Sequence, residues 1–472
     1  MTRRPVDPTS VPLEAYCQRF DDDFRTVNQR NAFRRYLEGL LLPSERTKTL
    51  TALANVEPLV GIQRPQVQRL QWFVSESSWS PEVVNARRLA VRQADPVTAP
   101  DPDGVLVIDE HGDRKWGSKT AHVGRQYLAN LGKVDLGVVS VSSLWADERV
   151  YWPVDVVPYT PAQHFPQGRT DPAFHTKLQL AEHLVHQAQA RGLPFRAVVA
   201  DCLYGEDRRF TASLEQMSVG YVVALKSSHT WWHPAGAIGA LWEAAEQSGW
   251  QGPAQPGPWV RVDRRFRDGH RATWWALEVV AGPYGPAKPR RAVVVTTDPA
   301  TLPDLSTWYL RTNLPAPNAP ATANHAQPTA DLTEIVRLYG LRQWVEQSYK
   351  QVKQRLGWSQ YQVRSDLAIR RHWALVCCAF SCCWSLAGAG RRADQPATVD
   401  DDPSPRPEHR SAGRGENPAR TDLAPSAPTG ARLADPLGLA PTLVARLVRG
   451  AATARTPSLA RCTSSGSPPR LL

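Results

Sequence analysis

The amino-acid sequence predicts an α/β protein with a mixed central sheet, preceded by an all-α region and followed by a disordered tail. Two short apolar runs, VLVID at 105–109 and RAVVAD at 196–201, each end in an aspartate, as buried strands do when they deliver a functional group at a sheet edge. Residues 12–95 show only helical patterns punctuated by prolines. After about residue 387 the chain is rich in Pro, Arg, Gly and Ser and cannot bury enough apolar surface to fold.

The composition favours a polyanionic partner. The 472 residues include 56 Lys and Arg against 45 Asp and Glu, a net charge of +11 with a pI of about 9.5. An ordinary, mildly basic soluble protein is the alternative. The sequence shows no apolar run long enough for a membrane span, and its first ten residues, MTRRPVDPTS, lack the apolar core of a signal peptide. We therefore expect a cytoplasmic protein without membrane segments.

Four of the seven cysteines crowd one apolar segment, WALVCCAFSCCWSLAG. A zinc site would need several thiolates that converge on one centre. Small side chains within a helical apolar run also pack well in a protein core. The pattern favours core packing over zinc binding for Cys377, Cys378, Cys382 and Cys383.

Residues 1–95 are predicted to form a helical DNA-binding domain. Helical segments run over residues 14–20, 26–42 and 64–93, with prolines between them. Arginines beside a short turn and a second helix suit contact with a DNA backbone. An ordinary all-α cap domain is the alternative. The arginines that lie off the apolar stripe of the second segment are Arg30, Arg34 and Arg35.

The first part of the α/β core is predicted at residues 96–224. A turn-rich boundary, PVTAPDPDG, leads into the Asp109 strand and two further strands, GVVSVSSLW and RVYWPVDVVPY, which is how an RNase H-like sheet begins. A helix over residues 174–192 then precedes the Asp201 strand. Because a helix between strands predicts parallel pairing, we expect Asp109 and Asp201 to meet at one sheet edge. For either aspartate alone, a turn or helix cap is the alternative.

Residues 225–330 are longer than one connection requires and are predicted to form a β-rich insertion domain. Trp-rich strand patterns such as WVRVDRRFRDGHRATWWALEVVAG and RRAVVVTT alternate with Pro-rich turns. Antiparallel hairpins would lay alternate arginines along a DNA backbone. These arginines are Arg261, Arg264, Arg265, Arg267 and Arg271.

Residues 331–387 are predicted to complete the core with two helices, and residues 388–472 form the tail. Residues 339–353, YGLRQWVEQSYKQVK, are predicted to form one helix with a polar stripe beside an apolar stripe that docks on the core. A carboxylate flanked by Arg and Lys stays ionised and can hold a cation while its neighbours hold phosphate. A solvated helix face is the alternative. The polar stripe contains Tyr339, Arg342, Glu346, Tyr349 and Lys353.

The spacing Tyr-x2-Arg-x3-Glu-x6-Lys resembles the signature of DDE transposases of the insertion-sequence 4 superfamily. Further stretches resemble its 701-like branch: IDE followed by KWG and GRQYLANLGKV, an Ala-Asp strand end followed by Tyr-Gly, and LGWSQYQVRSDLAIRRHWALV. The resemblance covers roughly residues 15–386. The sequence departs from the family at His111 and Asp113, which replace Thr and a hydrophobic residue, at Asp135-Leu136, which replaces Asn-Cys, and at Cys202-Leu203.

The resemblance implies that Asp109, Asp201 and Glu346 are catalytic metal ligands that hold two Mg²⁺ ions, with Mn²⁺ able to substitute. Two ions about 3.5 to 4 Å apart generate a nucleophile and stabilise the leaving oxygen, and Mg²⁺ takes few protein carboxylates. The expected contacts to DNA phosphate come from Tyr339, Arg342, Lys353, Lys115 and Arg125.

The family also carries an aromatic that stacks on a base flipped out of the duplex, a contact worth on the order of 1 to 3 kcal/mol. Trp274, Trp275 and Trp308 are candidates, with core packing as the alternative. The predicted function is a transposase that cleaves double-stranded DNA at insertion-sequence ends and transfers the strand to target DNA. We expect a homodimer on DNA, associated with the bacterial nucleoid. An RNase H-like nuclease without strand transfer, or a catalytically decayed DNA-binding relative of a transposase, are the alternatives.

Overall fold

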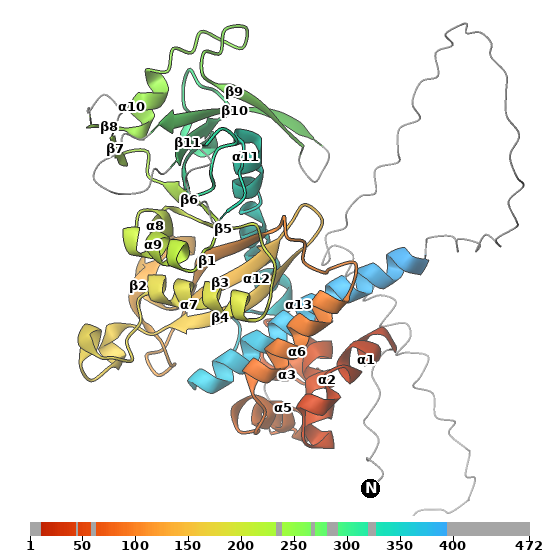
Figure 1. Ribbon diagram of the computed structural model, residues 1–472. Helices are drawn as coiled ribbons and strands as arrows, with labels where there is room; N and C mark the ends of the chain where they lie inside the picture. Colours follow the sequence, from red (N-terminus) through yellow and green to blue (C-terminus); the bar gives the residue numbers. More distant parts are fainter. Residues whose placement is uncertain are drawn as a thin grey trace, which may run out of the picture.

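The computed structural model describes residues 11–43, 46–57, 63–232, 238–265, 270–280, 291–319 and 327–393. Its centre is a ten-stranded mixed sheet with helices around it (Figure 1). Along the sheet the strands follow the order β2-β3-β1-β5-β6-β12-β11-β10-β9, and β4 pairs with β3. This architecture confirms the predicted α/β fold class. Arg267 and nearly all of the predicted tail lie outside the described residues.

The strands predicted to be RNase H-like form one end of this sheet. β1, β3 and β4 make an antiparallel meander, and β1, β5 and β6 are parallel. Helices occupy both parallel crossovers, since parallel neighbours cannot be joined by a tight turn. The bounds are β1 (Val105–Arg114), β2 (Gly124–Leu128), β3 (Lys133–Ala146), β4 (Tyr151–Tyr159), α7 (Lys177–Ala190), β5 (Ala197–Ala200), α8 (Cys202–Gly205), α9 (Arg208–Gln216) and β6 (Tyr221–Leu225).

The strands of the predicted insertion continue the same sheet. β12 pairs antiparallel with β6, and β11, β10 and β9 follow in turn, which places them beyond β6 at the top of Figure 1. A second apolar cluster, which includes Leu241, Trp259 and Trp275, lies in this part. The bounds are β7 (Thr230–Trp232), β8 (Ile238–Ala240), α10 (Leu241–Glu246), β9 (Val260–Arg265), β10 (Arg271–Val280), β11 (Arg291–Thr296) and β12 (Thr307–Thr312).

The N-terminal helices pack against the last helix, α13, at the lower right of Figure 1. The prediction that Arg34 faces DNA is wrong, because its buried guanidinium lies 2.7 Å from both Glu14 and Asp21. Arg30 is buried as well, and Arg35 pairs with Glu38 at 2.7 Å. A DNA-binding role for residues 1–95 stays a prediction, and Arg35 is the exposed one of the three arginines. The bounds are α1 (Val11–Gln18), α2 (Val27–Leu41), α3 (Leu50–Leu53), α5 (Pro65–Ser75), α6 (Pro81–Ala94) and α13 (Asp366–Ala393).

Helix α13 ties the N-terminal helices to the sheet. Arg88 of α6 donates to the carbonyl oxygens of Pro153 and Val154 on β4 and to Ser381 on α13. The four clustered cysteines of α13 are all buried, which confirms their predicted core packing. Burial raises the pKa of the Cys377 thiol to about 11, so it stays protonated at neutral pH. Among helices in the described ranges, none combines the length and hydropathy needed to cross a membrane.

Candidate active site

Asp109 lies on β1 where the pairing of β1 with β5 ends. The last parallel pair aligns Ile108 with Ala200, so Asp109 and Asp201 follow at adjacent positions on neighbouring strands. The predicted strand end at Asp109 is wrong, because β1 continues to Arg114 along its antiparallel partner β3. Asp109 is therefore buried within a strand, whereas Asp201 stands at the start of a helix.

Arg342 links the two aspartates. Its Nη2 atom lies 3.5 Å from Oδ2 of Asp109 and 3.9 Å from Oδ2 of Asp201, so these two oxygens are at most 7.4 Å apart, the sum of both distances. Asp201 also caps α8, because its Oδ1 accepts a hydrogen bond from the Leu203 N–H at 2.9 Å. One carboxylate oxygen of Asp201 thus has a structural role while the other faces Arg342.

The single helix predicted over residues 339–353 is interrupted at Arg342. Helix α11 (Leu332–Gly340) ends just before it, and α12 (Gln343–Leu356) begins just after it. At the break the Arg342 N–H bonds to the Tyr339 carbonyl three residues back, a tighter turn than an α-helix makes. Gly340 favours this ending because glycine costs conformational entropy in a helix, and an added Cβ there would lie 2.2 Å from Nη2 of Arg264.

The break separates the predicted polar stripe into two parts. Tyr339 lies on α11 and is buried, with its ring 5.1 Å from the ring of Trp308, and burial raises the pKa of its hydroxyl to about 12. Glu346 lies in the first turn of α12 and is exposed. Arg342 and Glu346 are four residues apart and share a side of this helix.

Like charges surround Asp109. Burial raises the pKa of Asp109 to about 7, Arg342 opposes the rise, and the carboxylates of Asp201 and Glu346 add to it. The structure therefore brings Asp109, Asp201, Arg342 and Glu346 into one electrostatic group. Such a group of carboxylates is stabilised by any cation that enters it, and Arg342 is the cation that occupies it here.

The carboxylate oxygens of this site are the type of ligand that a hard divalent cation prefers. Mg²⁺ prefers carboxylate and water oxygens. Asp109 and Asp201 both contact Arg342, and Glu346 lies near enough to Asp109 to raise its pKa. Within the described part of the chain, no three His, Cys, Asp or Glu side chains stand close enough together to hold a metal ion as placed. The residues therefore fit a magnesium site by the chemistry of their oxygen atoms, while Arg342 contacts both aspartates in this structure.

Lys353 forms a second polar group beside these carboxylates. Its Nζ lies 2.8 Å from Oδ1 of the buried Asp113, and Nε2 of His111 lies 3.2 Å from the same oxygen. Burial lowers the pKa of Lys353 to about 8 and raises the pKa of Asp113. The sequence marked Asp113 only as a departure from the family pattern. Its spacing from Asp109 could have revealed it, because residues 109, 111 and 113 share one face of β1.

The two other predicted phosphate contacts differ in accessibility. Lys115 is half-buried: its Nζ donates to the Ser359 carbonyl at 3.1 Å and lies 3.4 Å from the centre of the Tyr361 ring. Arg125 is exposed on the edge strand β2. Arg125 can therefore reach a ligand as it stands, whereas Lys115 would first have to leave its contacts.

The three tryptophans proposed for base stacking lie in two different places. Trp274 and Trp308 pack together with ring centres 4.5 Å apart, and the Arg264 guanidinium lies 5.1 and 5.0 Å from their rings. Trp275 belongs to the second apolar cluster, with its ring 4.7 Å from that of Trp250. Trp274 and Trp275 are buried, so stacking on a base would require either ring to leave its present contacts.

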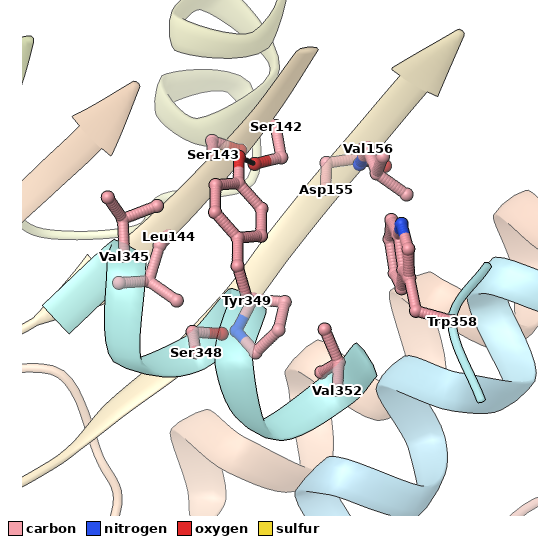
Figure 2. A pocket seen from close by; sticks show the side chains of 11 residues that line it. Ser142, Ser143, Leu144, Asp155, Val156, Val345, Ser348, Tyr349, Val352 and Trp358 are labelled. Carbon is pink, nitrogen blue, oxygen red and sulfur yellow. Dashed lines mark hydrogen bonds between the residues drawn. The ribbon is translucent and has the colours of Figure 1, made fainter. Parts of the chain in front are cut away.

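A small cavity lies beneath α12 rather than at the carboxylates. Figure 2 shows Tyr349 reaching from α12 toward β3, where its hydroxyl lies 2.5 Å from the Ser142 hydroxyl. The cavity holds about 20 Å³, enough for one water molecule. Two lining atoms, Ser143 Oγ and Trp358 Nε1, are buried without a hydrogen-bond partner in the described structure.

Two comparisons with known proteins bear on this arrangement. A model of the DDE superfamily endonuclease family matches residues 19–278, a range that includes Asp109 and Asp201. The chain is also 32% identical over 368 residues to the probable transposase for insertion sequence element IS701 of Microchaete diplosiphon. That match covers 76% of this chain and 84% of the relative.

Proposed function

The chain belongs to the DDE superfamily of endonucleases and is an IS701-like transposase, and we propose that it cleaves insertion-sequence ends and transfers the strand with Asp109, Asp201 and Glu346. In this proposal the three carboxylates hold two Mg²⁺ ions, for which Mn²⁺ can substitute. When bound, such ions activate water and stabilise the leaving oxygen. The observation that carries the proposal is the convergence on Arg342 of two aspartates from adjacent parallel strands, with Glu346 one turn away.

Each residue of the site has a distinct part in this reaction. Asp109 is held rigidly inside β1, so its carboxylate stays in place when the site binds DNA. Arg342 moves from the aspartates to a phosphate oxygen of the substrate, an exchange of one anionic partner for another. Lys353 binds a second phosphate from the same side, and Tyr339 anchors the break between α11 and α12 that positions Arg342.

The reaction we propose has two displacement steps at phosphorus. Water attacks the phosphodiester at the element end, and the bond to the departing 3′ oxygen breaks. The freed 3′ hydroxyl then attacks a phosphodiester of the opposite strand or of target DNA, forms a new phosphodiester with it and displaces the 3′ oxygen of the attacked strand. In both steps negative charge develops on the oxygens around the reacting phosphorus. The same set of carboxylates, with the ions that it holds, can therefore serve both steps.

The transposase family implies a DNA substrate. We propose double-stranded element ends and target DNA as the partners, bound by a homodimer, in the cytoplasm at the bacterial nucleoid. The excess of basic residues supports this partner, since phosphate neutralisation supplies most of the non-specific affinity for DNA.

The test is cleavage of duplex DNA that carries the sequences flanking this gene. We expect cleavage with Mg²⁺ or Mn²⁺, none with EDTA, and none for Asp201→Asn in either metal. A second assay supplies pre-cleaved ends, which only a transposase joins to target DNA. Cleavage without joining would favour a nuclease, and DNA binding unaffected by Asp201→Asn without any cleavage would favour a decayed, DNA-binding relative.

A further inference from the structure

We propose that the β2–β3 hairpin and the loop before it form a second DNA-binding surface, which contacts the duplex a few base pairs from the reacting phosphate. This inference rests on the proposed function and extends it beyond the carboxylate site. We define the hairpin face as Arg125, Tyr127 and Val134, together with the exposed Trp116 of the preceding loop. Their exposure carries the argument, because Trp116 is 84% exposed, Tyr127 58% and Val134 53%.

The strand register puts Arg125, Tyr127 and Val134 on one face of the hairpin, whereas Lys133 is opposite Leu128 and points to the other face. Tyr127 of β2 is directly opposite Val134 of β3, and Arg125 is two residues from Tyr127 and so points the same way. β2 is the outermost strand of the sheet. Exposed apolar side chains that lie side by side, as Tyr127 and Val134 do, are typical of an interaction surface.

The charge around the hairpin face favours DNA over a second protein chain. Residues 114–136 contain five basic residues and one acidic residue, Asp135. Arg114 and Lys133 share that single carboxylate at 3.1 and 3.7 Å, so most of the positive charge is not neutralised locally. A second copy seated with the same face here would bring the same basic residues against it, which disfavours self-association through this face. Exposed aromatics among cations suit contact with the sugars and bases of a groove flanked by phosphates.

The loop that carries Trp116 is fixed rather than loose. Lys115 donates to the Ser359 carbonyl at 3.1 Å, and the Ala121 N–H donates to the Arg364 carbonyl at 2.8 Å. His122 Nε2 lies 2.7 Å from Oδ1 of Asp366 at the start of α13. These three anchors hold the exposed indole in place, with the Arg114 guanidinium 4.0 Å from its ring. A rigid exposed aromatic loses little entropy when it binds.

The distance along β1 sets where this surface would meet DNA. Arg114 is five residues beyond Asp109 on the same strand, roughly 17 Å at about 3.4 Å per residue. The same length corresponds to about five base pairs of duplex. A duplex with its reacting phosphate at the carboxylates and its axis along β1 would therefore reach the hairpin face within half a helical turn.

The experiment compares DNA affinity for two duplexes that share the element end, measured by fluorescence anisotropy in EDTA so that no cleavage occurs. The short duplex extends two base pairs past the reacting phosphate in the direction of the hairpin face, and the long duplex extends twelve base pairs in that direction. We expect Trp116→Ala and Tyr127→Ala to weaken binding of the long duplex roughly tenfold and binding of the short duplex less than twofold. Arg125→Ala should lower the slope of log affinity against log salt concentration by about one.

The matched control is Trp242→Ala, which removes an exposed tryptophan on α10, far along the chain from the hairpin. We expect it to bind both duplexes as the unaltered protein does, and thermal melting should show all variants folded. Equal affinity of the variants and the unaltered protein for the long duplex would overturn the inference. The inference would also be overturned if the variants had a lower molar mass in solution than the unaltered protein but the same DNA affinity. That result would assign the hairpin face to contact with a second copy of the chain. The assay measures DNA binding in the absence of cleavage. A failure of the proposed cleavage chemistry can therefore be told apart from a failure of this inference.

Discussion

Lys353 of α12 and Asp113 of β1 form an ion pair at 2.8 Å in which the carboxylate is buried. This pair joins the helix that carries Glu346 to the strand that carries Asp109. The ion pair therefore connects two elements that carry proposed ligands, in addition to placing a cation on the side of α12 that carries Glu346. Lys353 cannot bind a phosphate and Asp113 fully at the same time.

Removing Asp113 separates these two roles. We expect Asp113→Ala to lower the free energy of unfolding by about 3 kcal/mol, since an unpaired charge remains in a poorly hydrated place. The double variant Asp113→Leu, Lys353→Met should recover most of that stability, because an apolar pair of similar volume replaces the ion pair. Its DNA cleavage should stay low. Urea unfolding and single-turnover cleavage measure the two effects, and full cleavage by the double variant would rule out a role for Lys353.

Arg342 is expected to compete with metal ions before DNA binds. Its guanidinium contacts both aspartates, so Arg342→Gln should strengthen Mn²⁺ binding to the DNA-free protein roughly tenfold at pH 8, where removing a nearby positive charge favours a cation. Cleavage should nevertheless fall, because the phosphate contact is lost. Mn²⁺ titration followed by electron paramagnetic resonance gives the affinity. Arg337→Gln is the control, since Arg337 pairs with Glu334 and Glu148; weaker Mn²⁺ binding by Arg342→Gln would contradict the competition.

His372 should make the fold sensitive to acid. Its Nε2 lies 3.1 Å from the Gly357 carbonyl, which only accepts, so Nε2 carries the proton and Nδ1 accepts from the Tyr36 hydroxyl at 2.8 Å. Burial lowers the pKa of His372 to about 4, below its value near 6.5 when unfolded. The unfolded state then binds more protons between these values, so this contribution to stability is complete above pH 6.5 and is lost as the pH falls toward 4.

The corresponding measurement is urea unfolding at pH 7 and pH 5. We expect the difference in unfolding free energy between the unaltered protein and His372→Gln to change by about 2 kcal/mol between these pH values. Taking the difference removes the contribution of other titrating groups. A difference that does not vary with pH would show that the neutral imidazole is not required.

Gly205 should tolerate no side chain. An added Cβ would lie 1.8 Å from the Ala224 carbonyl oxygen of β6, a backbone atom that cannot easily move. Gly205→Ala should therefore displace α8, which Asp201 caps, and lower stability by on the order of 3 kcal/mol as well as slowing cleavage. Gly117→Ala is the matched control, because nothing lies within 4 Å of its added Cβ. Thermal melting compares the two, and equal melting temperatures would contradict the close packing of α8 on β6.

The sequence was sufficient where local pattern determines structure. Two apolar runs that end in aspartate predicted neighbouring parallel strands, and the register places Asp109 beside Asp201. The Glu and Lys spacing predicted a common helix side, and Glu346 and Lys353 both lie on α12, seven residues apart. The cysteine-rich run predicted a buried helix because its apolar residues surround small ones, and α13 buries them.

The sequence was insufficient where distant segments decide the outcome. Arg34 looked available for DNA, yet Glu14 and Asp21 approach it only after the helices pack. The close approach of Arg264 to Gly340, which leaves no space for a side chain at residue 340, comes from the distant strand β9. Strand pairing between β12 and β6 likewise joins the predicted insertion to the core sheet through contacts that no local pattern reveals.

The most direct test of the central claim concerns Glu346, the proposed ligand farthest along the chain from the aspartates. Single-turnover cleavage of element-end DNA in Mg²⁺ should fall at least a thousandfold in Glu346→Gln, on the order of the effect of removing one group that stabilises the transition state, while DNA affinity stays within a few-fold. Glu334→Gln, which alters a glutamate of α11 paired with Arg337, should cleave at the unaltered rate. Unaltered cleavage by Glu346→Gln would contradict the three-carboxylate site.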